Sequence, residues 1–287
     1  MSARPAIPPC AGEEDHRVAA AAAIARAAAA ALRCELDTYP KPGLVSPVDS
    51  GSHADMDAGT FRASAAAITP FFADLALAGA AAAPMPALRR IGLDAEAAMR
   101  AATGGVNTHR GAIFGLGLLC AAAGALPAAA AGALGRLVRE RYGEAILAGP
   151  VLLHAPGARA RRRHGVGGAP AEAAAGFPAL YRVGLPALRR GRRLHPGDPD
   201  AARVETCLAL IAHLEDTNLL HRGGPEGYAF ARMQAARFIT DGGVAQPDWR
   251  DRAQAIHHAF VARNLSPGGA ADLLAMTLFV DGFEAAP

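Results

Sequence analysis

Aromatic side chains are scarce in this chain: phenylalanine, tyrosine and tryptophan together make up 5% of its 287 residues. The hydrophobic fraction is nevertheless 52%, and alanine supplies most of it. Alanine favours helices, whereas strands draw on β-branched and aromatic residues. We therefore expect an all-α protein. We also expect no nucleic-acid partner, because a binder of single strands needs aromatic platforms and a strongly basic surface.

Lysine is almost absent. Lys41 is the only lysine, and arginine carries the rest of the positive charge, for a net charge of +3 that suits an anionic small molecule. A Walker A loop requires Gly-Lys followed by Ser or Thr, but Lys41 is followed by Pro42. The motifs HExxH and GxSxG do not occur, and Pro170 stands where a dinucleotide fingerprint over 165–170 needs its third glycine. A nucleotide bound here is therefore held by another architecture.

Paired cysteines are also missing, because Cys10, Cys34, Cys120 and Cys207 are far apart and form no CxxC. Free thiols of this kind indicate a reducing compartment, and the acidic N-terminus does not match a secretory signal. The uncharged span 111–135 is long enough to cross a membrane, but it is only weakly apolar and Pro127 interrupts it. We expect two buried helices there, no membrane contact and a cytoplasmic location.

The helical pattern predicts a flexible tail over residues 1–15 and one compact multi-helix catalytic domain over 16–287. Prolines and capping residues punctuate the pattern. Helices are expected up to Leu36, from Asp57, from about Leu88 to Ala101, on both sides of Pro127, up to Arg193, from Asp198, and from near Gly227, Asp248 and Gly269. The stretch 149–170 lacks a pattern. The arginine clusters at 159–163 and 189–193 are either solvated or attract a polyphosphate.

The chain is organised around residues 102–114, where a Gly-Gly loop leads into a helix. Gly104 and Gly105 allow positive φ and close backbone approach, and Asn107 or Thr108 is a suitable N-cap. Free N–H groups at a helix N-terminus attract phosphate, and His109 and Arg110 in the first turn would add contacts. The candidate residues of this segment are therefore Gly104, Gly105, Asn107, Thr108, His109 and Arg110. The alternative is an ordinary helix connection.

A second polar segment runs from Glu35 to Asp57. Two prolines would present Lys41 from a stiff loop, and the carboxylates with His53 offer oxygen ligands for Mg²⁺ and a proton acceptor. The alternative is a solvated loop with ordinary turn chemistry. The candidate carboxylates are Glu35, Asp49, Asp55 and Asp57.

Two further polar segments, 215–224 and 264–274, again place glycine pairs beside polar residues. Asp216 is either a functional carboxylate or simply a helix cap, and Asp272 lies in a helix first turn beside an apolar face. Each segment alone is a weak signal. Together, Gly104-Gly105, Gly223-Gly224 and Gly268-Gly269 are expected to converge on one phosphate-bearing ligand.

These segments together resemble the triphosphoribosyl-dephospho-CoA synthase family, which serves prosthetic-group synthesis for citrate lyase and malonate decarboxylase. The matching text is PKPGLV at 40–45, GSHADM at 51–56, ATGGVNTH at 102–109, DTNL at 216–219 with RGG at 222–224, and NLSPGG at 264–269 with ADLL at 271–274. The segments keep the family's order and cover nearly the whole chain from Glu35. One departure is Pro170, at or near which an arginine is expected; Arg161 to Arg163 lie close enough in sequence to substitute.

The resemblance implies an all-α enzyme that joins the triphosphoribosyl group of ATP to 3′-dephospho-CoA and releases adenine, with Mg²⁺ accompanying ATP. The sugar carbon would pass through an oxocarbenium-like state. The product would go to a carrier-protein transferase, and a homodimer is possible. The wording of 39–57 leans toward the malonate pathway.

Three roles follow as hypotheses from this resemblance. Asp55 and Asp216 hold Mg²⁺, Glu35 or Asp272 is the general base, and His109 donates to adenine or binds phosphate; the carboxylate roles could be exchanged. The substrate-binding residues are Lys41, Gly43, Ser52, His53, Gly104, Gly105, Asn107, Thr108, Arg110, Asn218, Arg222, Gly223, Gly224, Asn264, Ser266, Gly268 and Gly269. The alternatives are a Mg²⁺-dependent all-α hydrolase of N-glycosidic or ADP-ribose-like bonds and a non-catalytic nucleotide- or CoA-binding protein.

Overall fold

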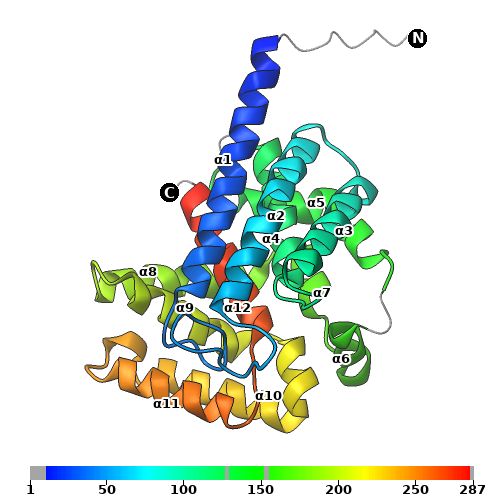
Figure 1. Ribbon diagram of the computed structural model, residues 1–287. Coiled ribbons are helices and arrows are strands. Elements are labelled where there is room, and N and C mark those ends of the chain that lie inside the picture. Colours follow the sequence, from blue (N-terminus) through cyan, green and yellow to red (C-terminus); the bar gives the residue numbers. More distant parts are fainter. Residues whose placement is uncertain (1–10, 127–128, 152–154, 285–287) are drawn as a thin grey trace.

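The computed structural model describes residues 11–126, 129–151 and 155–284, and its described elements are all helical (Figure 1). The α-helices are α1 (Ala11–Leu36), α2 (Ala58–Ala80), α3 (Met85–Ala102), α4 (Arg110–Ala125), α5 (Ala133–Leu147), α6 (Pro156–His164), α7 (Gly168–Ala174), α8 (Leu185–Leu194), α9 (Pro199–His213), α10 (Thr217–Thr240), α11 (Trp249–Val261) and α12 (Gly268–Phe283). A π-helical turn, η1 (Leu180–Gly184), leads into α8, and a 3₁₀ turn, η2 (Gly243–Ala245), follows α10. The all-α prediction is confirmed.

The centre of the molecule is a group of four helices, α1, α2, α4 and α12, that pack against one another. Small residues let them approach closely. A Cβ on Gly79 of α2 would lie 1.8 Å from the Ala121 carbonyl oxygen, and one on Gly124 of α4 would lie 2.0 Å from the Ala76 carbonyl oxygen. Alanine and glycine thus give this core its close backbone contacts, as the composition predicts, at the expense of aromatic packing.

The remaining helices surround this group. Helices α3, α5 and α7 flank α4, and α9 joins α12 to α8 and α10. Helix α11 lies against α10 at the lower edge of Figure 1, and the first turns of α1 extend away from the body of the molecule. The end of α1 and the N-termini of α4, α10 and α12 carry most of the polar residues of the cavity described below.

Several predicted boundaries differ from the structure. Helix α1 begins at Ala11, inside the predicted tail, and residues 1–10 lie outside the described residues. The stretch 149–170 was expected to be irregular, but α6 and the start of α7 fall within it. Helix α6 begins with a proline and ends at Gly165, which is in the left-handed region. Its four arginines and two alanines form no apolar stripe, so the sequence pattern did not predict this short helix.

The expected helix near Gly227 is the second half of α10. This helix begins at Thr217 with Asp216 as its N-cap, and it is kinked at Gly224, whose φ is 60°. Helix α3 begins at Met85, slightly before the predicted Leu88. The uncharged span 111–135 contains one of the two expected helices, α4, which ends at Ala125. The next helix, α5, begins only at Ala133 and lies mostly beyond the span, while Pro127 lies outside the described residues.

One described helix, α2, is long and apolar enough to cross a membrane by length and composition. Its most apolar window is 39% buried inside the protein, where the helix packs on α1, α3 and α4. Core helices of soluble proteins meet the same criterion, so this helix is weak support for a membrane span. Cys34, Cys120 and Cys207 are free thiols, as predicted.

Candidate active site

A cavity of about 950 Å³ opens between the central helices and the polar loops. This is near the upper end of the range for small-molecule pockets. Fourteen of the predicted site residues line it: Glu35, His53, Asn107, Thr108, His109, Arg110, Asp216, Asn218, Arg222, Asn264, Ser266, Gly268, Gly269 and Asp272. The segments that the sequence analysis selected separately therefore meet at one place.

Asp216 is buried at the N-terminus of α10, and both of its oxygens accept backbone hydrogen bonds. Oδ1 accepts from the N–H groups of Asn218 at 2.8 Å and Leu219 at 3.2 Å, which is an N-cap. Oδ2 accepts from the N–H of Ala270, in the first turn of α12, at 3.0 Å. Burial still raises the pKa of Asp216, and these hydrogen bonds oppose the rise. Asp216 thus joins two helix ends.

Asp272 lies one turn into α12 and is partly open to the cavity. Its carboxylate lies against the first turn of α4, where a Cβ on Gly111 would be 1.9 Å from Oδ2 and where the N–H of Ala112 lowers its pKa slightly. Burial raises the pKa of Asp272 well above its ordinary value, and the charges of Glu35 and Asp216 raise it further. No salt bridge to Asp272 is present among the described residues. It is the carboxylate most able to accept a proton.

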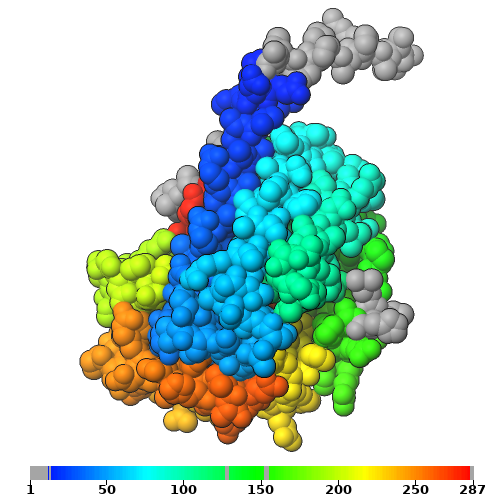
Figure 2. All heavy atoms as spheres, in the orientation of Figure 1, coloured from blue at the N-terminus to red at the C-terminus, as the bar shows by residue number. Residues whose placement is uncertain are grey.

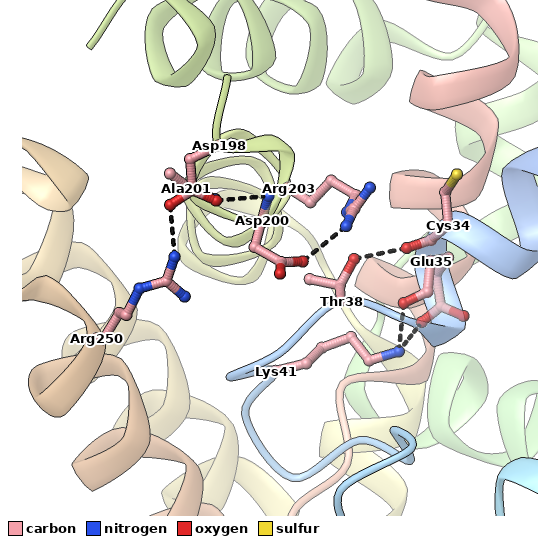
Figure 3. Close-up of polar contacts among 9 residues, drawn as sticks. All are labelled: Cys34, Glu35, Thr38, Lys41, Asp198, Asp200, Ala201, Arg203 and Arg250. Atoms are coloured by element: carbon pink, nitrogen blue, oxygen red, sulfur yellow. Dashed lines mark hydrogen bonds and ion pairs between the residues drawn. The ribbon is translucent and has the colours of Figure 1, made fainter. Parts of the chain in front are cut away.

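Glu35 ends α1 and is paired with Lys41. The Lys41 ammonium donates to Glu35 Oε1 at 2.5 Å and to the Glu35 carbonyl oxygen at 2.7 Å (Figure 3). Only 1% of the Lys41 side chain is exposed, and this residue is not part of the cavity lining. Burial raises the pKa of Glu35, whereas the Lys41 charge lowers it. The lysine, expected to extend from a loop toward phosphate, instead lies inside the protein on a carboxylate.

His109 is buried to 3% exposure at the start of α4. Its Nδ1 is 2.6 Å from the Ser64 hydroxyl, which in turn accepts from the Thr108 hydroxyl at 2.7 Å. Burial, and after it the charge of Lys41, lowers the pKa of His109 to about 4, so the imidazole is neutral at pH 7. His109 itself is the N-cap position of α4, without a side-chain cap. The predicted caps Asn107 and Thr108 stand before it; the Asn107 side chain accepts from the Arg110 N–H at 3.3 Å.

The loop 37–57 is hydrogen-bonded to the segment 264–266, which precedes α12. Ser52 donates to the Leu265 carbonyl at 2.7 Å, and His53 Nε2 is 2.9 Å from the Ser266 hydroxyl. Arg222 bonds to the Ser52 carbonyl and to the backbone and side chain of Asn264. In Figure 2 this loop packs directly on the α11 segment.

The same loop depends on His257 of α11. His257 Nε2 is 3.2 Å from Asp49, and Nδ1 is 3.0 Å from the Lys41 carbonyl and 3.3 Å from the Gly43 nitrogen. A Cβ on Gly43, whose φ is 66°, would lie 2.0 Å from the Leu265 carbonyl oxygen, so this position requires glycine. Asp57 caps α2. Asp49 therefore helps to fix the loop through His257, and Asp57 stabilises the start of α2.

Eight predicted residues do not line the cavity: Lys41, Gly43, Ser52, Asp55, Gly104, Gly105, Gly223 and Gly224. Gly104 and Gly105 are exposed, with open space where a Cβ would stand. Of the three glycine pairs, only Gly268-Gly269 lies on the cavity wall. Positive φ at Gly104, Gly105 and Gly224 accounts for these glycines through backbone shape alone.

The predicted magnesium ligands do not fit a metal site held by the protein. Asp216 already accepts hydrogen bonds on both oxygens, and the Asp55 side chain is 62% exposed beside His53. Across residues 11–126, 129–151 and 155–284, no three His, Cys, Asp or Glu side chains are placed to hold a metal ion. Magnesium remains a prediction tied to ATP itself.

The chain matches the family model for ATP:dephospho-CoA triphosphoribosyl transferase over residues 21–286. The chain belongs to this family. It is a triphosphoribosyl-dephospho-CoA synthase by family, an enzyme of the transferase class with ATP and dephospho-CoA as the substrates that the family implies.

Curated relatives cover nearly the whole chain. A probable 2-(5''-triphosphoribosyl)-3'-dephosphocoenzyme-A synthase of Stutzerimonas stutzeri is 44% identical over 91% of this chain and 92% of its own length. The similarly named protein of Azotobacter vinelandii is 41% identical over 90% of both chains. The 2-(5''-triphosphoribosyl)-3'-dephosphocoenzyme-A synthase of Pectobacterium atrosepticum is 41% identical over 86% and 84%. No solved structure matches the chain.

In this triphosphoribosyl-dephospho-CoA synthase, two kinds of cavity residue were not predicted from the sequence. Ser64 is a single serine among alanines of α2, and only the fold brings it to His109. The apolar wall comes from helices that carry no motif, including Leu88, Leu118, Ile146 and Met276. Arg161, from the first arginine cluster, also lines the cavity, whereas the cluster at 189–193 does not.

Proposed function

We propose that this enzyme joins the triphosphoribosyl group of ATP to 3′-dephospho-CoA, releases adenine, and so makes 2′-(5″-triphosphoribosyl)-3′-dephospho-CoA. The observation that supports this best is the group of Asp272, Glu35 and Asp216, whose charges act on one another, on the wall of one large cavity that neutral His109 also lines. Buried acidic groups suit proton transfer and stabilisation of a cationic sugar carbon, which is what glycosyl transfer needs.

Asp272 is our candidate for the general base. Its pKa is raised by burial and by two carboxylate neighbours, so it accepts a proton more readily than an ordinary aspartate. Glu35 is held in an ion pair by Lys41, and Asp216 is occupied by backbone N–H groups. Those two carboxylates keep their structural contacts, and their charges help to raise the pKa of Asp272.

The proposed step conserves protons. The attacking ribose hydroxyl of dephospho-CoA forms the new C–O bond and gives its proton to Asp272. The C–N bond of ATP breaks, adenine leaves with the electron pair and takes a proton from water, and Asp272 returns its proton to water. His109 faces the departing base.

Arginine side chains at the cavity offer the phosphate contacts. Arg222 holds the Ser52 and Asn264 carbonyls together, and Arg110 pairs with Glu96 at 3.3 Å. Arg161 lies next to the turn at Gly168, where a Cβ would be 3.0 Å from its Cδ. Since Pro170 also lines the cavity, Arg161 is placed to substitute for the arginine that the family resemblance implies near Pro170.

The finer parts of the assignment stay predictions. Delivery of the product to a carrier-protein transferase, service to malonate decarboxylase or citrate lyase, and a homodimer are proposed on the resemblance. A cytoplasmic location is proposed on the unpaired cysteines and the acidic N-terminus. The names of the relatives do not distinguish the two pathways.

The proposal is tested by incubating the purified protein with ATP, Mg²⁺ and dephospho-CoA and separating bases and nucleotides by chromatography. We expect free adenine in step with loss of dephospho-CoA, and a new species heavier by one triphosphoribosyl unit. Adenine release that ignores the acceptor would identify a hydrolase. ADP or AMP would identify phosphoryl chemistry, and no adenine from a folded, ATP-binding protein would overturn the proposal.

A further inference from the structure

A chain of three side chains connects α2 to the start of α4. The Thr108 hydroxyl donates to Ser64 Oγ at 2.7 Å, and Ser64 Oγ lies 2.6 Å from His109 Nδ1. Ser64 is fully buried and His109 is 3% exposed. The other two hydroxyls of α2 make only local contacts: Thr60 bonds to the N-cap Asp57, and Thr69 donates to the Ala65 carbonyl at 2.6 Å.

The direction of this chain determines the state of the imidazole. Ser64 has one hydroxyl hydrogen, and its oxygen already accepts from Thr108. The Ser64 oxygen has a second lone pair, but if it also accepted from His109, the buried Ser64 hydrogen would have no acceptor among the described contacts. Donation from Ser64 to an unprotonated His109 Nδ1 is therefore the favoured arrangement. In a neutral imidazole the proton then lies on Nε2. Burial and the Lys41 charge favour the neutral ring by lowering the pKa of His109 to about 4.

The Nε2 side of the ring faces the cavity. Among the described residues, His109 Nε2 has no hydrogen-bond partner, and it is not a fully buried unpaired atom either. Because His109 lines the cavity, the remaining accessible side of Nε2 is the cavity itself. Phe61 packs against the His109 ring in a T-shaped arrangement with 4.8 Å between ring centres, and the Met99 sulfur accepts the His109 backbone N–H at 3.2 Å.

We propose that Ser64 and Thr108 are positioning residues that hold His109 as an Nε2–H donor, and that this donor binds an acceptor nitrogen of the departing adenine. The second half of this inference rests on the proposed function. A neutral donor stabilises the electron pair that collects on the purine and keeps its own proton throughout. The ligand class is thus a purine with a free ring-nitrogen acceptor.

The first test observes the tautomer without any substrate. Long-range ¹H–¹⁵N NMR of the histidine side chains, with His109 assigned through a His109→Gln variant, should show an Nε2–H imidazole at pH 7. Ser64→Ala and Thr108→Val should each shift this signal toward a mixture of tautomers, whereas Thr108→Ser should preserve it. A native Nδ1–H signal, or no change in both variants, would overturn the positioning role.

The second test separates positioning from simple structural support. Ser64→Ala and Thr108→Val should lower kcat about tenfold, the value of one hydrogen bond, with KM for ATP nearly unchanged. Thr108→Ser should restore the rate. Thr69→Val, in the same helix but bonded only to the Ala65 carbonyl, is the matched control and should keep native activity and melting. An equal loss in Thr69→Val would indicate a structural effect.

The third test identifies the acceptor on the purine. Native protein should use either 3-deaza-ATP or 7-deaza-ATP more slowly than ATP, and Ser64→Ala should lose most of that discrimination. If native protein uses both analogues at the same rate as ATP, the proposed contact between His109 and the purine is excluded. If native protein releases no adenine at all, the proposed function fails, while the tautomer measurement still decides whether Ser64 and Thr108 position His109.

Discussion

The N-terminus of α10 and the first turn of α12 bring carboxylates to the same cavity and use them in opposite ways. Asp216 precedes α10 and receives three backbone N–H groups from two helices. Asp272 lies in α12, is only partly open to the cavity, and has little to offset its burial. Both pKa values are raised, but only that of Asp272 is raised far.

This difference shows that burial alone does not make a carboxylate functional. Hydrogen bonds to the charged form stabilise Asp216 as a structural acceptor. Asp272 lines the cavity and has carboxylate neighbours of like charge, which is the environment of a proton acceptor. The site thus contains one carboxylate that holds helices together and another that is available to substrate.

Among the substitutions proposed here, Asp272→Asn should have the largest effect, and it distinguishes the catalytic role of Asp272 from the structural role of Asp216. Loss of a general base lowers rates by about 10²- to 10⁴-fold, and we expect kcat of Asp272→Asn to fall within that range. ATP affinity, measured by calorimetry, should stay near native. Turnover within a few-fold of native would exclude Asp272 as the base.

The stability of the same variant gives the control. A carboxyl whose pKa is raised on folding stabilises the protein below its unfolded pKa, and this contribution is lost as the pH rises through the folded pKa. Asp272→Asn should therefore be at least as stable as the native protein at pH 7 in urea. A variant that is less stable at pH 7 would indicate that Asp272 is structural like Asp216.

The third carboxylate of the cavity, Glu35, is tested through its partner Lys41. Removing one partner of a buried ion pair costs roughly 3 to 5 kcal/mol, and we expect Lys41→Met to lose that much stability at pH 7. Without the Lys41 charge the pKa of Glu35 rises further, so the loss should grow as the pH rises above the ordinary value of 4.5. Urea unfolding across this range measures it.

The matched control is the double variant Lys41→Met with Glu35→Gln, which removes the unpaired charge and should recover most of the stability at neutral pH. Stability close to native in Lys41→Met alone, together with weaker ATP binding, would show instead that the ammonium turns toward phosphate in solution.

Substitution of Asp216 should lower the stability of the fold rather than act on the chemical step. Asp216→Ala removes an N-cap and leaves the Ala270 N–H unsatisfied, for a loss of roughly 2 to 4 kcal/mol. Asp216→Asn keeps one acceptor oxygen and should lose less. Chemical denaturation of the three proteins tests this order. Full stability with abolished turnover in Asp216→Asn would instead support a magnesium ligand.

The smallest effect is expected at Asp55, which is exposed and does not line the cavity. Asp55→Asn should change stability by less than roughly 0.5 kcal/mol, as surface substitutions do, and should leave the Mg²⁺ requirement unchanged. Titration of activity against Mg²⁺ measures this. A much higher requirement in Asp55→Asn would restore the role predicted from its position beside His53.

The sequence was enough to predict the helical class, the family and the segments that meet at the cavity. Alanine content and proline positions act on the nearby backbone, so they predict the helices and most of the helix ends. The motifs at 51–56, 216–219 and 264–269 indicated a shared site because their residue types match one chemistry. The short helix α6 was missed because its arginines and small residues leave no apolar stripe.

The roles within the site were decided by tertiary structure. Sequence spacing does not show that Lys41 turns inward onto Glu35, that Gly104 and Gly105 face solvent, or that Ser64 reaches His109 across 45 positions. A pKa depends on burial and on charges within a few ångströms, and those distances are set by how helices pack. Asp216 and Asp272 look alike in the sequence, as carboxylates at helix starts. Only the packing of α10, α12 and α4 gives one of them three N–H groups and leaves the other facing the cavity.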